Sequence, residues 1–178
     1  MIPKNLPPVY GSLSVVPGFV DFHAQHNPDR PWAIFPSDTS PSGTSSISFQ
    51  EFAHATHRVA HHVRPERQGN ELEVVVIVAH TDAVLYVSLL AGMMRAGVIP
   101  FPLSPKTSPE AIKQFMKKTS AHRIITQDVF RPVFKKVQRQ LGEEGFNIDI
   151  EILYPWTRSS LRSTWEVKPA SFEEDATQ

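Results

Sequence analysis

An unbroken run of β-branched residues, "VVVIV" at positions 74–78, limits what this chain can fold into more than any other feature. Such a run is typical of a strand that is buried on both faces, as the strands of a parallel sheet are. An apolar stretch of helical length at 82–96 and a second apolar run, "VIPFPL" at 98–103, follow directly. The order of strand, helix and strand predicts a βαβ unit with two parallel strands.

The ends of the helix predicted over 82–96 carry residues that favour helix ends. Thr81 or Asp82 can cap its first turn, and Gly97 stands where a left-handed residue commonly closes a helix. Arg95, in the last turn, is expected to face the negative end of the helix dipole. Because the helix is apolar nearly all round, we expect other elements to cover most of its sides.

Pro100 and Pro102 indicate where the strand over 98–103 lies in its sheet. They are two residues apart, so the positions of both missing N–H groups face the same side of the strand. A central strand needs donors on both sides. The sequence therefore predicts an edge strand or a strand that pairs only briefly.

Segments on both sides of this unit continue the alternation of helices and strands. Before it, the sequence predicts a helix that ends at Asn27-Pro28, a hairpin of "WAIF" and "SISF", and a helix over about 49–63. Ser48 and Glu51 form a capping-box pattern at the start of that last helix.

After the unit, Ser108 and Pro109 predict the start of another helix, with Ile112, Phe115 and Met116 on its buried face. The strand "HRIIT", a helix over about 128–141 and the strand "IDIEIL" follow.

Together these segments predict an α/β fold with a largely parallel sheet and flanking helices. The 178 residues suffice for one domain or a large part of one. Residues 1–17 are interpreted as a Pro-rich lead and 18–178 as the domain. Its segment 155–178 is predicted to be an irregular tail, because the periodic pattern ends there.

The composition excludes or disfavours several functional classes. Lys+Arg and Asp+Glu both number 18 and no basic stripe alternates with aromatic residues, so we expect no nucleic-acid partner. The longest apolar segment, 83–94, is too short to span a bilayer and no polybasic arm is present, so we expect no membrane partner. Cysteine is absent, which excludes disulfides, thiol catalysis and Cys-based zinc sites. Without a signal-peptide pattern, the sequence predicts a cytoplasmic protein.

Four histidines on the helix over 49–63 form the most obvious candidate metal site: His54, His57, His61 and His62. The i/i+4 spacing of His57 and His61 can hold a metal ion. However, the first three fall opposite the apolar face of the helix, and no carboxylate or cysteine close in sequence supplies a third ligand. A solvated polar face is the favoured interpretation, and no metal ligand is assigned.

A second candidate site consists of His80, Thr81 and Asp82, between a predicted strand and a predicted helix. Ligands often bind at the carboxyl ends of parallel strands, so these residues could serve an α/β enzyme. A helix cap requires the same residue types as Thr81 and Asp82. Capping is therefore the favoured interpretation.

Motifs that bind phosphate or activate a nucleophile are missing. The sequence contains no G-x-G-x-x-G, no G-x-x-x-x-G-K-S/T and no G-x-S-x-G. The acidic groups that could act as acid or base lie in polar segments that we expect to be exposed: Glu143, Glu144, Glu173, Glu174 and Asp175. The residues alone predict a scaffold and assign no catalytic residue.

Two segments resemble motifs of the adenylate-forming (AMP-binding) enzyme superfamily, which includes acyl-CoA synthetases and the adenylation domains of nonribosomal peptide synthetases. The pattern L/I-S/T-Y/F-x-E-L/F is matched by Ile47, Ser48, Phe49, Glu51 and Phe52. The pattern K/R-A-G-x-x-x-x-P-L-x-P is matched by Arg95, Ala96, Gly97, Pro102, Leu103 and Pro105. The resemblance covers about residues 15–178, and the segment "VDFHAQHNPDRPWAIF" is similar to the fungal reductase-type members.

The resemblance implies the N-terminal portion of a ligase that activates a carboxylic acid as an acyl-adenylate, using ATP and Mg²⁺, and passes it to a thiol. In that family ATP is bound by a Ser/Thr/Gly-rich loop ending in Pro-Lys, which follows a D-x-A segment. Here the sequence ends at that point, in "EEDATQ". We therefore expect a truncated fragment that binds neither ATP nor Mg²⁺ by itself and is inactive alone. No catalytic, cofactor-binding or metal-binding residue of the family is carried over.

The partners implied are the remainder of the adenylation domain, in cis or in trans, together with a carboxylic acid and a thiol acceptor. Without that remainder, the apolar helix over 82–96 should expose a patch. Two alternatives stay open: a non-catalytic α/β interaction module that pairs with a separately encoded partner, and a standalone α/β enzyme that uses His80 and Asp82.

Overall fold

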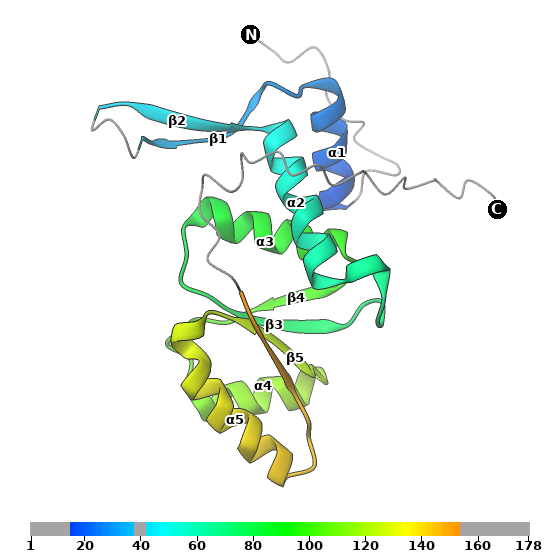
Figure 1. The fold of residues 1–178 in the computed structure, drawn as a ribbon, viewed down its shortest axis with the longest axis vertical. Helices are drawn as coiled ribbons and strands as arrows, with labels where there is room; N and C mark the ends of the chain where they lie inside the picture. The colour runs from blue at the N-terminus through cyan, green and yellow to red at the C-terminus, as the bar shows by residue number, and fades with distance from the viewer. Residues whose placement is uncertain (1–14, 38–41, 154–178) are drawn as a thin grey trace, which may run out of the picture.

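The computed structural model describes residues 15–37 and 42–153, in which helices and strands alternate as in an α/β protein (Figure 1). The predicted irregular tail over 155–178 lies outside these residues, as do positions 1–14 of the predicted lead. The last positions of that lead are helical, because the first helix begins at Val16. Among the described residues, no helix has the length and apolar character needed to cross a membrane.

The elements have bounds close to those that the sequence predicts. In chain order they are α1 (Val16–His26), β1 (Pro31–Pro36), β2 (Thr44–Ser48), α2 (Phe49–Val63), η1 (Pro65–Arg67), β3 (Val74–Val78), α3 (Ala83–Arg95), β4 (Ile99–Pro102), α4 (Pro109–Thr119), β5 (Arg123–Thr126), η2 (Asp128–Phe130), α5 (Arg131–Glu143) and β6 (Asp149–Ile152). The helix predicted over about 128–141 is divided, since it begins as the 3₁₀ turn η2 and continues as α5.

Four parallel strands form the central sheet in the order β4-β3-β5-β6, while β1 and β2 form a separate antiparallel hairpin. In the register of the sheet, Val76 of β3 lies opposite Phe101 of β4 and Ile124 of β5. The last four residues of β3 are buried, as expected for a strand that helices cover on both faces.

β4 is an edge strand, as its prolines predict. The N–H groups of Ile99 and Leu103 each donate to a carbonyl oxygen on the β3 side, at 2.8 Å. Since backbone groups point alternately to the two sides of a strand, Pro100 and Pro102 turn their nitrogens toward the free side. The sheet loses no hydrogen bond at either proline.

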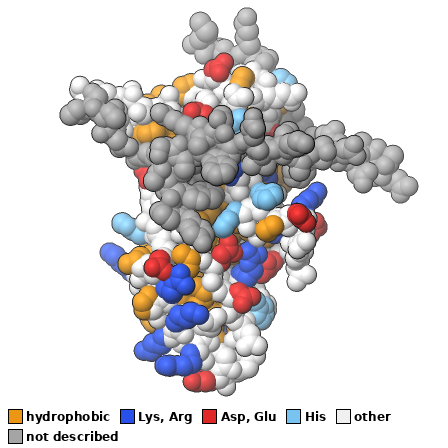
Figure 2. All heavy atoms as spheres, viewed as in Figure 1, with side chains coloured by type: hydrophobic (Ala, Val, Ile, Leu, Met, Phe, Trp, Pro, Cys, Tyr) orange, Lys and Arg blue, Asp and Glu red, His pale blue; other side chains and the backbone are white. Residues whose placement is uncertain are grey.

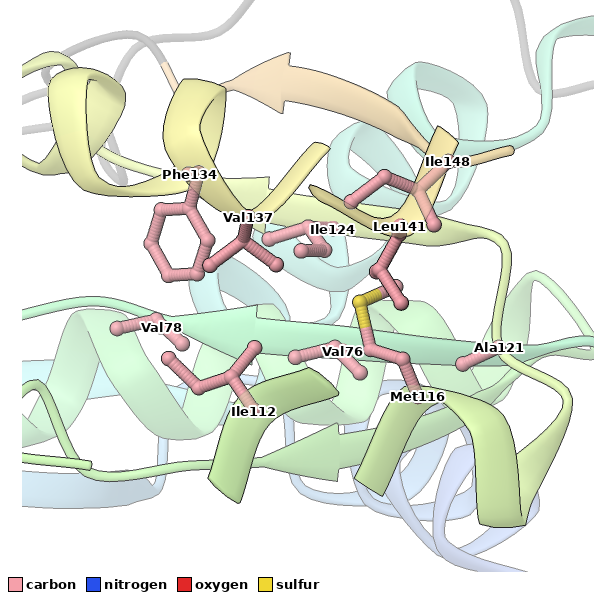
Figure 3. Close-up of a cluster of buried hydrophobic side chains, with 10 residues drawn as sticks. All are labelled: Val76, Val78, Ile112, Met116, Ala121, Ile124, Phe134, Val137, Leu141 and Ile148. Carbon is pink, nitrogen blue, oxygen red and sulfur yellow. The ribbon is translucent and has the colours of Figure 1, made fainter. Parts of the chain in front are cut away.

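Helices cover both faces of the sheet, with α2 and α3 on one face and α4 and α5 on the other (Figure 1). Figure 3 shows the core on the second face, where Met116 of α4 and Phe134 and Leu141 of α5 lie against Val76 and Ile124 of the sheet. A separate apolar cluster joins the hairpin and α1 to the outer side of α2 and α3; it includes Val20, Ile47, Phe52 and Leu85.

One residue predicted for the core is displaced from it. Phe115 of α4 is 37% exposed, whereas Ile112 and Met116 are buried. Its ring contacts Phe101 of the edge strand, with the two ring centroids 5.8 Å apart. Because β4 is the last strand on that side, the sheet is too narrow to bury the whole ring.

α2 and α3 cross in close contact at Gly92. A Cβ atom at this position would lie 2.3 Å from Cβ of Val59 and 2.8 Å from the carbonyl oxygen of Thr56. Real Cβ atoms essentially never make contacts this short, so the crossing as it stands requires glycine. This packing explains a glycine in the middle of a helix, where it lowers helix propensity.

The N-terminus of α3 is capped by Asp82, whose Oδ1 accepts the N–H of Val84 at 2.9 Å. Beyond the C-terminus, Gly97 adopts the predicted left-handed conformation, with φ of +75°. The expectation for Arg95 is wrong, because its guanidinium turns to the carboxylate of Asp21 on α1, a stronger acceptor than the helix end. Arg64 takes the predicted place and donates to the carbonyl of Ala96 at 2.7 Å.

Among the described residues, α3 is covered by the sheet on one side and by α1 and α2 on another. Val87 and Met94 lie seven residues apart on the helix and are 43% and 42% exposed. These two partly exposed residues lie on a helix that was expected to expose apolar surface. We call Val87 and Met94 the open stripe of α3.

Candidate functional site

The carboxyl ends of the four parallel strands meet at one edge of the central sheet. This carboxyl edge carries His80, Thr81 and Asp82 after β3, Ser104 after β4 and Gln127 after β5. In open α/β sheets, ligands bind by preference at this edge. It is therefore the first place to test for a site.

Hydrogen bonds connect the polar groups of the carboxyl edge. The backbone N–H of His80 donates to Oε1 of Gln127 at 2.7 Å, and the buried hydroxyl of Thr126 donates to the carbonyl of Val78 at 2.8 Å. Sequence reasoning overlooked Gln127, whose only signal was its position directly after a strand. The imidazole of His80 is exposed and Asp82 acts as a helix cap. Catalytic use of His80 and Asp82 stays a prediction.

The start of α3, at the carboxyl edge, differs from a helix N-terminus that binds phosphate. A helix N-terminus attracts phosphate through free N–H groups and a positive dipole end. At the start of α3, the carboxylate of Asp82 already accepts the Val84 N–H and brings a negative charge. The junction "VAHTDA" also has no glycine that would let a phosphate approach the backbone.

α2 does not gather its histidines into one site. His54 and His61 are exposed, as predicted. Nε2 of His57 lies 3.8 Å from Asp21 of α1, and Nε2 of His62 lies 3.1 Å from Glu151 of β6. Within 15–37 and 42–153, no group of three or more His, Cys, Asp or Glu side chains could hold a metal ion.

Arg95 forms a polar junction between three helices. Its guanidinium donates to both carboxylate oxygens of Asp21 on α1, at 2.9 and 2.5 Å, and to the hydroxyl of Thr56 on α2 at 3.0 Å. Burial acts to raise the pKa of Asp21, but hydrogen bonds and positive charge from His57 and Arg95 outweigh it and hold that pKa at about 2. The junction positions helices, and no local pattern in the sequence predicts it.

Arg123 forms a second polar cluster, on the α2 side of the sheet. It donates to Glu73 at 3.1 Å, to Glu151 at 2.9 Å and to the carbonyl of Val63 at 3.0 Å. His62 meets Glu151 from α2. We call these four side chains, His62, Glu73, Arg123 and Glu151, the Arg123 cluster.

The acidic pairs behave as surface charges where the structure describes them. Glu144 forms ion pairs with Lys117 and Lys113 of α4, and Glu143 is exposed. Figure 2 shows charges of both signs interspersed over the half of the molecule that contains these helices. The other acidic candidates, Glu173, Glu174 and Asp175, lie outside the described residues.

Comparisons with known proteins identify the family to which the chain belongs. Residues 20–175 match the family model of the AMP-binding enzyme. The chain is 44% identical over 144 residues to "Adenylate-forming reductase Nps11" of Serpula lacrymans var. lacrymans (strain S7.9), a stretch that makes up 80% of this chain and 13% of that protein. It is 46% identical over 105 residues to "Adenylate-forming reductase Nps9" of the same organism, covering 59% of this chain and 9% of that protein. The chain thus spans a small part of the length of these relatives.

A solved structure agrees with the fold. The Mycobacterium tuberculosis fatty acyl CoA synthetase superposes on 84% of this chain with a TM-score of 0.61, using 28% of its own length, at 13% sequence identity. At that identity the likeness concerns the fold alone. The family model, however, matches nearly the whole sequence, from the second turn of α1 onward. The chain belongs to the AMP-binding enzyme family.

Proposed function

We propose that this chain forms the N-terminal part of an adenylation domain, in which a carboxylic acid reacts with ATP to give an acyl-adenylate and pyrophosphate. A thiol then takes the acyl group and AMP leaves. The match to the AMP-binding family over residues 20–175 is the observation that carries this proposal. The names of the Serpula relatives, which are adenylate-forming reductases, favour a member whose product is later reduced.

The segment that resembles the family motif has a structural role in this proposal. Arg95 joins three helices, and Gly97 ends α3 in a left-handed conformation. Pro102 has no N–H group, so it leaves no unpaired donor on the outer side of the edge strand. These residues shape a scaffold and do not offer a group that reacts. In this proposal the binding of ATP and Mg²⁺ belongs to the remainder of the domain, which supplies the phosphate-binding loop.

ATP–pyrophosphate exchange tests the proposal. The 178-residue chain alone should show only background exchange with a panel of carboxylic acids. A chimera in which this chain replaces the aligned 144-residue segment of the Serpula relative should exchange above background. The relative with that segment deleted is the control and should be inactive. Exchange by the isolated chain would overturn the proposal, as would a folded chimera without exchange.

A non-catalytic interaction module is the second candidate, and the open stripe of α3 favours it, since Val87 and Met94 leave apolar surface for another chain. Size-exclusion chromatography of this chain mixed with the separately produced remainder of the relative's adenylation domain tests it. Co-elution without exchange activity would favour the module. Separate elution would count against it.

A further inference from the structure

We propose that the contact between His62 and Glu151 is a proton-controlled latch that fastens β6, the last strand of the sheet, to α2. Nε2 of His62 lies 3.1 Å from Oε1 of Glu151, within reach of a charge-assisted hydrogen bond. The two residues are far apart in the sequence and come from different layers of the fold. The inference concerns conformation and is independent of the proposed function.

β6 is held by apolar packing of Ile150 and by polar contacts on both of its faces. Within the part of the chain that the structure describes, it pairs only with β5. On one face, Nε2 of Gln138 on α5 donates to the carbonyl of Ile148, just before the strand, at 2.6 Å. On the other face, Glu151 meets His62 of α2 and also accepts a hydrogen bond from Arg123 of β5. The imidazole of His122 also contacts the carbonyl oxygen of Asn147, just before the strand, at 2.7 Å, so His62 and His122 are the groups here that can change charge near neutral pH.

Charge balance in the Arg123 cluster favours a proton on His62. Glu151 faces His62 from β6, Arg123 faces it from β5, and Glu73 meets Arg123 from the segment before β3. Two carboxylates and one guanidinium leave an excess negative charge that a protonated imidazole neutralises. His62 also lies in the last turn of α2, where the helix dipole favours a positive charge.

The pKa of His62 is raised, first by the hydrogen bond to Glu151 and also by the negative charge of that carboxylate, against an opposing effect of burial. A raised pKa in the folded state means that the latch contributes fully below the unfolded value of about 6.5 and is lost as the pH rises through the raised value. Burial acts to raise the pKa of Glu151, but His62 and Arg123 outweigh it and lower that pKa, so the carboxylate stays charged over this range.

Hydrogen exchange of the β6 amides, compared with intrinsic rates at each pH, tests the proposal on the full chain. Between about pH 5.5 and pH 8.5, protection of β6 in the wild type should fall about two- to fivefold relative to β3, the modest effect expected of a partly exposed ion pair. In His62→Gln and Glu151→Gln this relative fall should disappear. His61→Gln is the matched control, because its exposed imidazole neighbours His62 on the same helix, and it should behave as the wild type does.

An NMR titration of the histidine side chains gives a second readout. Glu151→Gln should lower the pKa of His62 from its value in the wild type. If His62 titrates alike in both proteins, or if the protection of β6 falls as much in His62→Gln as in the wild type, the latch does not exist.

Discussion

At the scale of single residues, the fold depends on charged side chains that join distant parts of the chain. Arg95 is almost inaccessible, with 5% of its side chain exposed, while its partner Asp21 is half exposed. A guanidinium buried this deeply is unfavourable unless carboxylate or carbonyl oxygens surround it. Asp21 therefore matters more to the folded state than its place on the surface indicates.

Replacing Asp21 by Asn tests this dependence. The change should cost about 1–2 kcal/mol of unfolding free energy near neutral pH, a value reduced by solvent screening of the half-exposed carboxylate. Because the folded pKa is depressed to about 2, the stabilisation is present above the unfolded value and is lost as the pH falls through the folded one. Urea denaturation and an acid titration measure both effects.

Asp29→Asn is the control for this pair, since Asp29 is an exposed residue shortly after α1. It should leave the stability and the acid transition unchanged. If Asp21→Asn and Asp29→Asn give the same acid transition, the junction at Arg95 contributes nothing. Neither this junction nor the Arg123 cluster follows from local sequence, because each joins residues that only the tertiary fold brings together.

At the scale of elements, the contact between α2 and α3 depends on a missing side chain. Gly92→Ala should raise helix propensity by up to about 1 kcal/mol, yet the new methyl group would overlap Val59. Overpacking of this kind typically costs about 1–3 kcal/mol. We expect a net loss of stability in urea or thermal denaturation.

Gly142→Ala in α5 is the matched control. A Cβ atom there meets nothing within 4 Å, so the same substitution should stabilise the protein by roughly 0.5–1 kcal/mol. If Gly92→Ala were equally stabilising, α2 could move away from α3 at no cost. The sequence predicted both helices from their caps and periodicity. It gave no indication that one glycine sets their separation, because that is a property of the pair.

At the scale of the whole molecule, the four parallel strands and their helices followed from apolar runs, caps and prolines, each of which acts over a few residues. The family, too, followed from two short motifs. The candidate sites were less predictable. Capping by Asp82 was expected, whereas Gln127 at the carboxyl edge and the carboxylates beside His57 and His62 depend on how distant elements pack.

A zero net charge and an exposed apolar stripe together predict self-association of the chain near neutral pH. Light scattering at about pH 7 should fall when Val87 and Met94 are both replaced by Lys, with an unchanged circular dichroism spectrum. Replacing the exposed Gln50 and Gln114 by Lys adds the same charge elsewhere. If this control lowers scattering equally, net charge alone governs the association and the open stripe has no part in it.

Because of the prolines of β4, the two edges of the sheet differ in their ability to pair with a further strand. Along the outer side of β4, Pro100 and Pro102 present carbonyl oxygens and no N–H group, so an arriving strand would find acceptors without donors. Along the outer side of β6, which pairs only with β5 among the described residues, donors and acceptors alternate as in any strand. A fifth strand could therefore pair with full hydrogen bonding beside β6. Beside β4 it would lack the hydrogen bonds that the two missing N–H groups would donate.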